Sequence, residues 1–273
     1  MNYDNNRQNA HNEIDHIFKD LLPTRNMAER PAQVALCHQM LNAMLEGGIA
    51  LCDAGTGIGK TYAYLVAGTV FRRLRAASGL AQPLLISTSS IALQNAIQRE
   101  YLPLLSAILM ADRMITSPLR AVIRKGKSHY VCDERLEWRL AQVDLKKKNQ
   151  AAAEALLSLR EWLDADEAVH LSGYDRERVC VPKVCDCQRD SCRYRTFLDH
   201  CGSAQFAFQI CNHNLLLADT IQKQREKLAS IDAEEPSAGR ARRRAMCNIT
   251  LIALEEKRDR MIKGKKEWHK NGH

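Results

Sequence analysis

Residues 54–61 read Ala54-Gly55-Thr56-Gly57-Ile58-Gly59-Lys60-Thr61, which has the form A-x-x-x-x-G-K-T of a phosphate-binding loop, or P-loop. The segment before it, residues 48–52, is short and apolar enough for a buried strand, and residues 62–73 carry apolar side chains at helical spacing. A strand, a glycine loop and a helix in this order are the context that such a loop requires. A tight glycine turn without a ligand is the alternative, and it is disfavoured because the spacing and both flanks agree.

Each residue type in this loop suits the binding of a phosphate group. Glycines at 55, 57 and 59 let the backbone N–H groups turn toward the anion, and the positive end of the following helix faces it too. We expect Lys60 to reach the β- and γ-phosphates of a nucleotide, and the Thr61 hydroxyl to hold Mg²⁺.

The segments around the loop continue an alternation of strands and helices. Residues 84–88, 119–123 and 205–211 read as further strands. The following segments read as helices: residues 14–22, residues 31–41, a helix capped by Ser89-Ser90 and running to Tyr101, residues 133–163, and a helix from Asn212. A strand, P-loop, helix, strand and helix in series predict an α/β fold with a parallel sheet and crossover helices.

The chain has 273 residues, and its excess of basic residues lies mainly in its tail. The net charge is +8, and residues 221–273 hold 14 Lys and Arg against 8 Asp and Glu. A basic balance suits nucleic acid, but a solvated basic helix accounts for this tail equally well. Residues 237–244 read as a linker or basic arm, and residues 249–268 as a charged amphipathic helix. The start of the chain is polar and no stretch is apolar enough to span a membrane, so we expect a cytoplasmic protein.

Four cysteines fall within thirteen residues, and a fifth lies far upstream. They are Cys180, Cys185, Cys187 and Cys192, with Cys132 before them. Without a secretory signal, such cysteines do not read as disulfides. A set of four thiols holds either a structural zinc or an iron–sulfur cluster, and the spacing alone favours neither metal. Thiols on a loop without metal are the alternative.

Five stretches, in the right order along the chain, together resemble the DinG-like, XPD-related DNA helicases. They are Arg30-Pro31-Ala32-Gln33, residues 53–61, residues 85–94, the stretch from Lys125 to Cys132, and Cys192 to Arg195 followed by the N-H-x-L-L segment from Asn212. The resemblance covers about residues 25–220 and is more specific than any single motif.

The resemblance implies a P-loop NTPase fold of the RecA-like type, here an incomplete first helicase motor domain, with an inserted helical, cysteine-rich iron–sulfur domain. The expected domains are a lead and helix over 1–24, an ATP-binding segment over 25–118, the iron–sulfur domain over 119–204, a return to the RecA-like domain over 205–220, and an unrelated basic helical tail over 221–273.

The resemblance also implies the residues of each site. Lys60 and Thr61 act in catalysis, and the nucleotide-binding set is Arg30, Gln33, Gly55, Thr56, Gly57, Gly59, Lys60 and Thr61, with Gln33 reading adenine. The residues implied to contact DNA are Thr88, Gln94, Lys125 and Lys127. The implied ligands of a [4Fe–4S] cluster are Cys132, Cys180, Cys185 and Cys192, with Cys187 as an alternative ligand and zinc as an alternative metal. The implied cofactors are ATP and Mg²⁺, and the implied partner is single-stranded or forked DNA, with neither a membrane nor a further small-molecule substrate.

The sequence departs from the family after Asp219. Such helicases carry a D-E-A-H motif after N-H-x-L-L, and residues 220–273 contain none. Asp166-Glu167-Ala168-Val169-His170 has one residue too many, and Ile231-Asp232-Ala233-Glu234 is no better. We therefore expect an ATP-dependent DNA helicase truncated before this motif and joined to unrelated sequence, and whether it is an enzyme stays open. The alternative is a non-enzymatic fragment that binds nucleotide and nucleic acid around a structural metal.

Overall fold

A computed structural model of the chain describes residues 3–143, 150–183, 185, 191–234 and 237–270. It divides into two compact units. The first unit comprises residues 1–86 and 91–210, and the second comprises residues 87–90 and 211–273.

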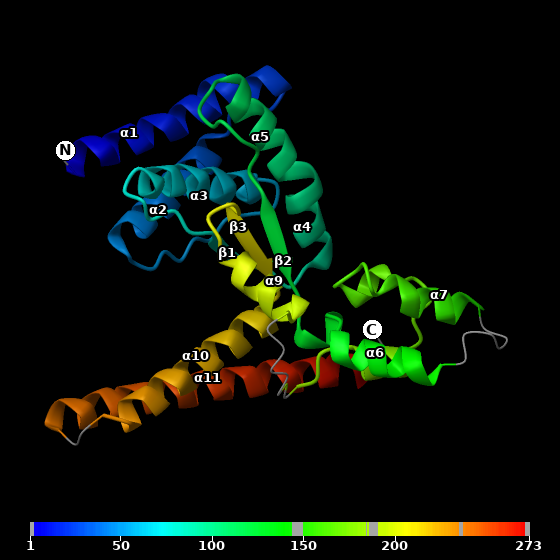
Figure 1. The fold of residues 1–273 in the computed structure, drawn as a ribbon. Helices are drawn as coiled ribbons and strands as arrows, with labels where there is room; N and C mark the ends of the chain where they lie inside the picture. The colour runs from blue at the N-terminus through cyan, green and yellow to red at the C-terminus, as the bar shows by residue number, and fades with distance from the viewer. Residues whose placement is uncertain (1–2, 144–149, 184, 186–190, 235–236, 271–273) are drawn as a thin grey trace. The chain divides into compact units, whose positions relative to one another are not determined.

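A parallel sheet of three strands lies at the centre of the first unit. The strands are β1 (Leu84–Ser87), β2 (Ala121–Arg124) and β3 (Phe208–Cys211), and their order is β1-β3-β2, with the last strand in sequence in the middle (Figure 1). Their starting ends are level, because Leu84 N donates to Ala207 O at 2.9 Å and Ala207 N donates to Arg120 O at 2.7 Å. The strands predicted near 84, 119 and 205 are confirmed.

The predicted strand at residues 48–52 is wrong. These residues form no strand, and the side chains of Ile49 and Leu51 are 93% and 96% exposed. A strand is stable only where a neighbour satisfies its N–H and C=O groups, and none of the three described strands pairs with this segment. Apolar composition predicted burial here, but burial of a strand depends on the chain beside it.

Three helices from the N-terminal part of the chain contribute to the main hydrophobic core beside the sheet. They are α1 (Tyr3–His16), α2 (Pro31–Glu46) and α3 (Lys60–Ala76), and Pro31 occupies the first turn of α2, where its missing N–H costs nothing. A Cβ atom at Gly68 would lie 2.9 Å from the side chains of Leu84 and Phe208, so the absence of a side chain there lets α3 approach the sheet closely. The core includes Ile14, Phe18, Leu41, Leu65 and Phe208.

Helical structure continues beyond two of the predicted ends. A π-helical turn, Ile17–Leu21, and a 3₁₀ turn, Leu22–Arg25, continue α1 past the predicted end at residue 22, and α1 itself begins at Tyr3, before the predicted start at residue 14. Helix α4 (Ile91–Ala96) and the π-helical turn Ile97–Tyr101 lead directly into α5 (Leu102–Ala111), which the sequence analysis missed. Pro103 breaks the helical pattern in the sequence, but it lies in the first turn of α5, where proline is tolerated.

The described residues between β2 and β3 (125–143, 150–183, 185 and 191–207) form a helical lobe with its own hydrophobic cluster. Its helices are α6 (Asp133–Gln142), α7 (Gln150–Ser158), α8 (Gly173–Val179) and α9 (Arg193–Cys201), with 3₁₀ turns at Lys127–His129 and Ala165–Glu167. Leu136, Leu156, Leu159 and Val179 are buried within it. We call this part the cysteine lobe. Its helical character agrees with the sequence, although α8 and α9 were not foreseen.

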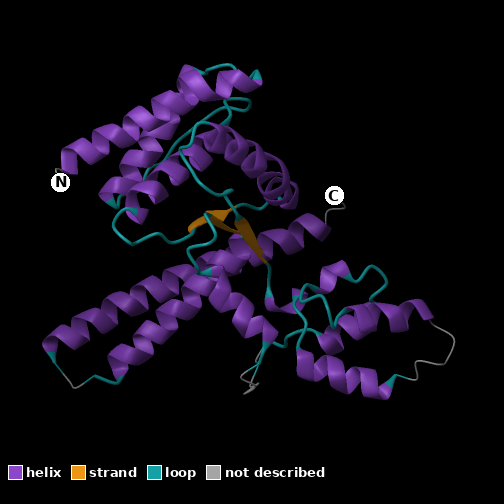
Figure 2. Cartoon of the chain, turned by 45° about the horizontal axis from the view of Figure 1, so that its top comes forward, coloured by secondary structure: helices purple, strands orange, loops and turns teal. Residues whose placement is uncertain are grey.

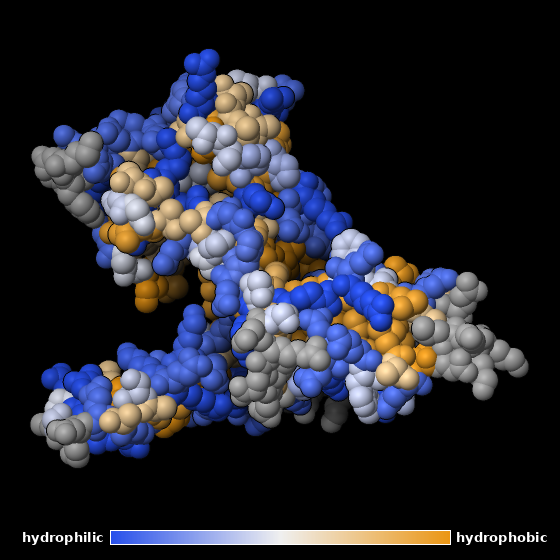
Figure 3. All heavy atoms as spheres, viewed as in Figure 1, coloured by the Kyte–Doolittle hydropathy of each residue, from blue (hydrophilic) through white to orange (hydrophobic). Residues whose placement is uncertain are grey.

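The second unit is a pair of long helices, α10 (His213–Asp232) and α11 (Ala238–Lys270), which lie side by side (Figure 2). Hydrophilic side chains cover most of the visible face of this pair (Figure 3). The linker predicted at 237–244 is wrong, because α11 begins there. Ser237 Oγ accepts from Arg240 N at 3.1 Å, and Arg244 Nε contacts Asp232 Oδ1 at 2.6 Å, so residues of α10 and a capping serine fix a segment whose charges suggested a loop.

None of the helices in the described ranges combines the length and the apolar character that crossing a membrane requires.

Candidate functional site: the P-loop and the cysteine lobe

The predicted P-loop leads into α3, as its sequence requires. Gly59 is the N-cap residue with φ +90°, and Gly57 has φ +81°, so both lie in the left-handed region that favours glycine. Helix α3 begins at Lys60, which places its positive end at the loop. Gly55 and Thr56 are exposed in the loop, and Thr61 is partly exposed in the first turn of α3. The loop therefore offers glycine curvature and a helix N-terminus at one place.

Two residues from the start of α2 hold this loop. An Arg30 guanidinium nitrogen donates to Gly57 O, and Gln33 Nε2 donates to Gly59 O at 2.7 Å. Gln33 is 6% exposed, and a Cβ atom at Gly59 would overlap its amide nitrogen. The structure thus brings the predicted residues Arg30, Gln33, Gly57 and Gly59 together, with Arg30 and Gln33 bonded to the loop backbone.

Lys60 folds back over the loop. Its Nζ atom donates to Ala54 O at 2.8 Å and to Gly55 O at 3.0 Å, and the side chain is exposed. A phosphate group entering the loop would replace two neutral carbonyl oxygens with charged acceptors, and hydrogen bonds to charged acceptors are stronger. The arrangement can hold the phosphate end of a nucleotide from one side.

The acidic look-alikes of the missing D-E-A-H motif are engaged within their own units. In the cysteine lobe, Asp166 contacts Lys125 Nζ at 2.8 Å, His129 Nδ1 at 3.0 Å and Arg176 at 2.7 Å. Burial raises the pKa of Asp166, but hydrogen bonds from Lys125 and His129 outweigh it and lower the value to about 2. In the second unit, Asp232 contacts Arg244 at 2.6 Å. These ion pairs explain both carboxylates as structural groups.

The four residues predicted to contact DNA lie in different surroundings. Gln94 is 6% exposed, and Thr88 Oγ1 accepts from Ser90 N at 3.2 Å. Lys125 Nζ lies 2.5 Å from Asp164 and 2.8 Å from Asp166. Burial lowers the pKa of Lys125, but its hydrogen bonds to these two carboxylates outweigh burial, so the pKa is raised. Lys127 is exposed, and its Nζ atom donates to Lys183 O at 3.4 Å. Only Lys127 of this set presents an exposed cationic side chain.

The sequence analysis missed one contact in the N-H-x-L-L segment. Asn212 caps α10 by accepting from Leu215 N at 2.7 Å, and His213 Nδ1 lies 2.7 Å from Ser87 Oγ. Ser87 ends β1 and His213 follows β3, so their contact depends on the adjacency of these two strands. The sequence carries a histidine beside a strand end as its signal, but not the strand order that brings a serine to it.

Three of the predicted cluster cysteines lie on backbone segments that contact one another. Cys132 N donates to Val179 O at 2.8 Å, and Val131 pairs with Cys180 in an antiparallel bridge. Cys192 precedes α9, where Arg193 Nε contacts Asp133 Oδ1 at 2.6 Å, one residue after Cys132. The Tyr130 ring lies 5.2 Å from Tyr194 and 5.0 Å from Phe197 between ring centres, which ties α9 to the same place.

The thiols themselves do not form a closed group. Among the described residues, no three His, Cys, Asp or Glu side chains lie close enough to hold a metal ion. Cys132 and Cys180 are buried, Cys192 is partly exposed and Cys185 is exposed. Cys187 lies outside the described residues. Thiol donors suit zinc or an iron–sulfur cluster, and three of the four backbone segments that carry them contact one another. The backbone of the lobe therefore fits such a group, while the described side chains are not arranged around it.

Comparison with curated proteins finds relatives that are named DinG or YoaA. The chain is 29% identical over 233 residues to the ATP-dependent DNA helicase DinG of Photobacterium profundum, which covers 78% of this chain and 31% of the relative. It is 30% identical over 222 residues to the ATP-dependent DNA helicase YoaA of Escherichia coli, covering 76% of the chain and 30% of the relative. It is also 31% identical over 146 residues to the 3'-5' exonuclease DinG of Bacillus subtilis, covering 54% and 14%.

The chain spans less than a third of the length of each of these relatives. No family model matches it, and no solved structure does.

Proposed function

Because the chain is related to the DinG-like ATP-dependent DNA helicases, we propose that it binds ATP with Mg²⁺ at the P-loop and contacts single-stranded or forked DNA. The observation that carries this proposal is the P-loop itself. Gly57 and Gly59 curve it, Lys60 lies over it, and Arg30 and Gln33 hold its backbone before any ligand arrives. A loop held in this way spends little binding energy on ordering itself.

The proposal assigns each loop residue a part. Lys60 contacts the β- and γ-phosphates, Thr61 holds Mg²⁺, and the backbone from Gly55 to Gly59 surrounds the phosphates. Gln33 has its amide on Gly59 O, so its contribution to nucleotide binding runs through the shape of the loop. Contact with adenine would require this hydrogen bond to exchange.

The cysteine lobe is proposed to hold a [4Fe–4S] cluster through Cys132, Cys180, Cys185 and Cys192, with Cys187 as the alternative ligand and zinc as the alternative metal. What supports this is the gathering of the segments that carry Cys132, Cys180 and Cys192. A bound metal would cross-link the start of α6, the end of α8 and the start of α9. The ion pair of Asp133 with Arg193 already connects α6 and α9. An absorbance band near 400 nm in the purified protein distinguishes iron–sulfur from zinc.

DNA is proposed to contact the exposed Lys127 and the segment from Thr88 to Gln94. Lys125 is placed to position the start of the cysteine lobe, since two carboxylates hold its ammonium group. Replacing Lys127 with Ala should therefore weaken the binding of single-stranded DNA, and the same change at Lys125 should mainly reduce stability.

Turnover by the chain of 273 residues is expected to be very low. Phosphoryl transfer is catalysed by positioning and by charges around the γ-phosphate, and an arginine finger by itself contributes about 10³ to 10⁵ in rate. The P-loop supplies charge from one side. A non-enzymatic nucleotide- and nucleic-acid-binding module is the second candidate, and the ion pairs that occupy Asp166 and Asp232 favour it.

One assay tests the proposal and separates the two candidates. Binding of a fluorescent ATP analogue and release of phosphate are measured with Mg²⁺, with and without single-stranded DNA, for the protein and for Lys60→Ala. The expected result is binding that Lys60→Ala removes, with little turnover in either protein. DNA-stimulated turnover that disappears in Lys60→Ala would show a working helicase motor, and an affinity unchanged in Lys60→Ala would contradict nucleotide binding at this loop.

A further inference from the structure

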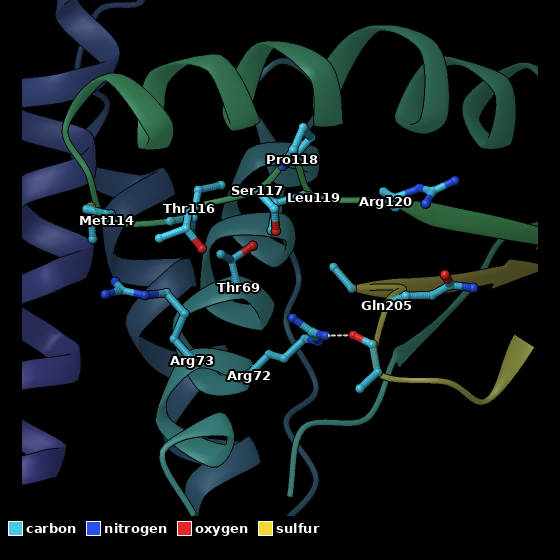
Figure 4. A pocket seen from close by; sticks show the side chains of 13 residues that line it. Thr69, Arg72, Arg73, Met114, Thr116, Ser117, Pro118, Leu119, Arg120 and Gln205 are labelled. Carbon is cyan, nitrogen blue, oxygen red and sulfur yellow. Dashed lines mark hydrogen bonds between the residues drawn. The ribbon is translucent and has the colours of Figure 1, made fainter. Parts of the chain in front are cut away.

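A pocket of about 310 Å³ opens at the end of the sheet where the strands begin. Its walls come from three parts of the first unit: the second half of α3, residues 114–120 before β2, and residues 204–207 before β3 (Figure 4). Lys60 and Arg72 are twelve residues apart on α3, which at 1.5 Å per residue puts the pocket about 18 Å along the helix from the P-loop. The pocket is therefore separate from the proposed nucleotide site.

The charge in this pocket is positive and largely uncompensated. Arg72 reaches toward its middle and donates to Ala204 O, a neutral acceptor, while its Nε atom is buried without a hydrogen-bond partner (Figure 4). Burial lowers the pKa of Arg72, but arginine remains charged at neutral pH. Arg120 stands over the Phe206 ring at 5.8 Å. Within the described residues, neither Arg72 nor Arg120 has a carboxylate partner, whereas Arg73 pairs with Glu13 at 2.6 Å.

Hydroxyl groups complete the lining. Thr69 is buried on α3, where its Oγ1 atom donates to Leu65 O at 2.7 Å, and Thr116 and Ser117 are exposed on the loop before β2. Figure 4 shows the Ser117 and Thr69 side chains facing each other across the space beside Arg72. A guanidinium with several N–H donors beside the Ser117 hydroxyl matches a tetrahedral oxyanion, which accepts hydrogen bonds from several directions.

We propose that this pocket binds a phosphate group through Arg72, Arg120 and Ser117, as a second anion site apart from the P-loop. A phosphate group would pair with a partly buried guanidinium that the fold leaves with one neutral acceptor, and an unpaired charge costs more as it is removed from water. The volume is at the small end for ligand pockets, so it accommodates a free phosphate or a small phosphate ester, or admits one backbone phosphate of DNA at its rim.

The site has a structural consequence for the fold. Arg72 lies on the helix that begins at the P-loop, and its acceptor Ala204 lies on the segment that returns from the cysteine lobe to β3. A phosphate held between α3 and the segment of residues 114–120 would join these two parts of the first unit. Occupancy should therefore raise the melting temperature of the first unit.

Calorimetric titration of Lys60→Ala with inorganic phosphate tests the proposal, because this background removes phosphate binding at the P-loop. A second titration uses a single-stranded oligonucleotide without terminal phosphates. Adding Arg72→Gln should lower the affinity for whichever ligand binds about tenfold or more, since hydrogen bonds to charged groups contribute about 1.5–3 kcal/mol. Arg120→Gln and Ser117→Asp change exposed residues at the rim of the pocket and should lower the same affinity. Arg75→Gln, on the same helix and outside the pocket, is the matched control.

Each outcome decides the proposal. Affinity for inorganic phosphate that depends on Arg72 and Arg120 supports a small-anion site, and dependence seen only with the oligonucleotide assigns the phosphate to DNA. If Arg72→Gln does not fold, Arg120→Gln and Ser117→Asp give the answer. If neither ligand responds to these variants more than to Arg75→Gln, the proposal is wrong. ATP binding measured with Lys60 intact should not change in Arg120→Gln, so a failure here is distinct from a failure of the P-loop proposal.

Discussion

The P-loop and the cysteine lobe belong to the same unit, but they differ in how far each is organised before a ligand binds. At the P-loop, Arg30, Gln33 and Lys60 already hydrogen-bond the loop backbone, and both left-handed positions are glycine. In the cysteine lobe, the backbone beside Cys132, Cys180 and Cys192 has gathered, while no three of the described His, Cys, Asp or Glu side chains lie close enough to hold a metal ion.

This difference has a physical cause. The P-loop gets its shape from nearby backbone geometry and from one helix start, which need no ligand. A metal site must bring several thiolates together, and their mutual repulsion is offset only when the metal binds. The comparison teaches that the nucleotide site should be rigid without its ligand, and that the cysteine lobe should gain much of its order from its metal.

The largest expected effect is the loss of metal. Cys132→Ser should remove the metal and lower the stability of the cysteine lobe by several kcal/mol, since structural metal sites contribute about 10 kcal/mol or more to folding. Metal content by elemental analysis and thermal unfolding measure this. The control is Cys52→Ser, an exposed cysteine outside the lobe. Equal metal content in the two variants would sink the assignment of Cys132.

The next effect concerns the shape of the P-loop. Gly59→Ala should abolish measurable ATP binding, because φ is +90° and the added methyl group would overlap Gln33. Gly79→Ala is the matched control: φ there is +72°, but the space around it is open. The control should cost about 1 kcal/mol of stability and leave ATP affinity unchanged. ATP binding retained in Gly59→Ala would contradict the rigid loop.

A smaller effect is expected from Gln33. Replacing it with Ala removes one hydrogen bond to Gly59 O, worth about 0.5–1.5 kcal/mol, and should weaken ATP binding about three- to tenfold. Guanine and adenine nucleotides should be weakened equally if Gln33 acts on the loop. A selective loss of adenine nucleotides in the same titrations would show that Gln33 reads the base.

The smallest effect concerns Asp166 in the cysteine lobe. Its pKa is about 2 in the folded protein against an ordinary value near 3.9, so it contributes stability above about pH 4, and that contribution is lost as the pH falls toward 2. Because the carboxylate is partly exposed, we expect no more than about 1 kcal/mol. Asp166→Asn should flatten this part of the acid unfolding curve, and an unchanged curve would show that the ion pairs of Asp166 add no stability.

The sequence by itself determined the P-loop, three strands and most helices, because each depends on residues that are neighbours in the chain. Glycine spacing sets the loop, and apolar periodicity sets α2 and α3. Helix α9 escaped detection because the cysteine-rich stretch from Cys180 to Cys201 suggested a loop, whereas α8 lies before that stretch.

Only the tertiary structure decided the features that join distant segments. Residues 48–52 form no strand, since pairing depends on a neighbour that apolar composition does not supply. Residues 238–244 form the start of α11, because Ser237 caps the helix and Asp232 contacts it through Arg244. The bond of Gln33 to Gly59, the contact of Ser87 with His213, and the pocket around Arg72 likewise arise from strand order and helix packing. Hydrogen bonds and charges act across space, so the chain order that sets local structure does not reveal which distant groups they join.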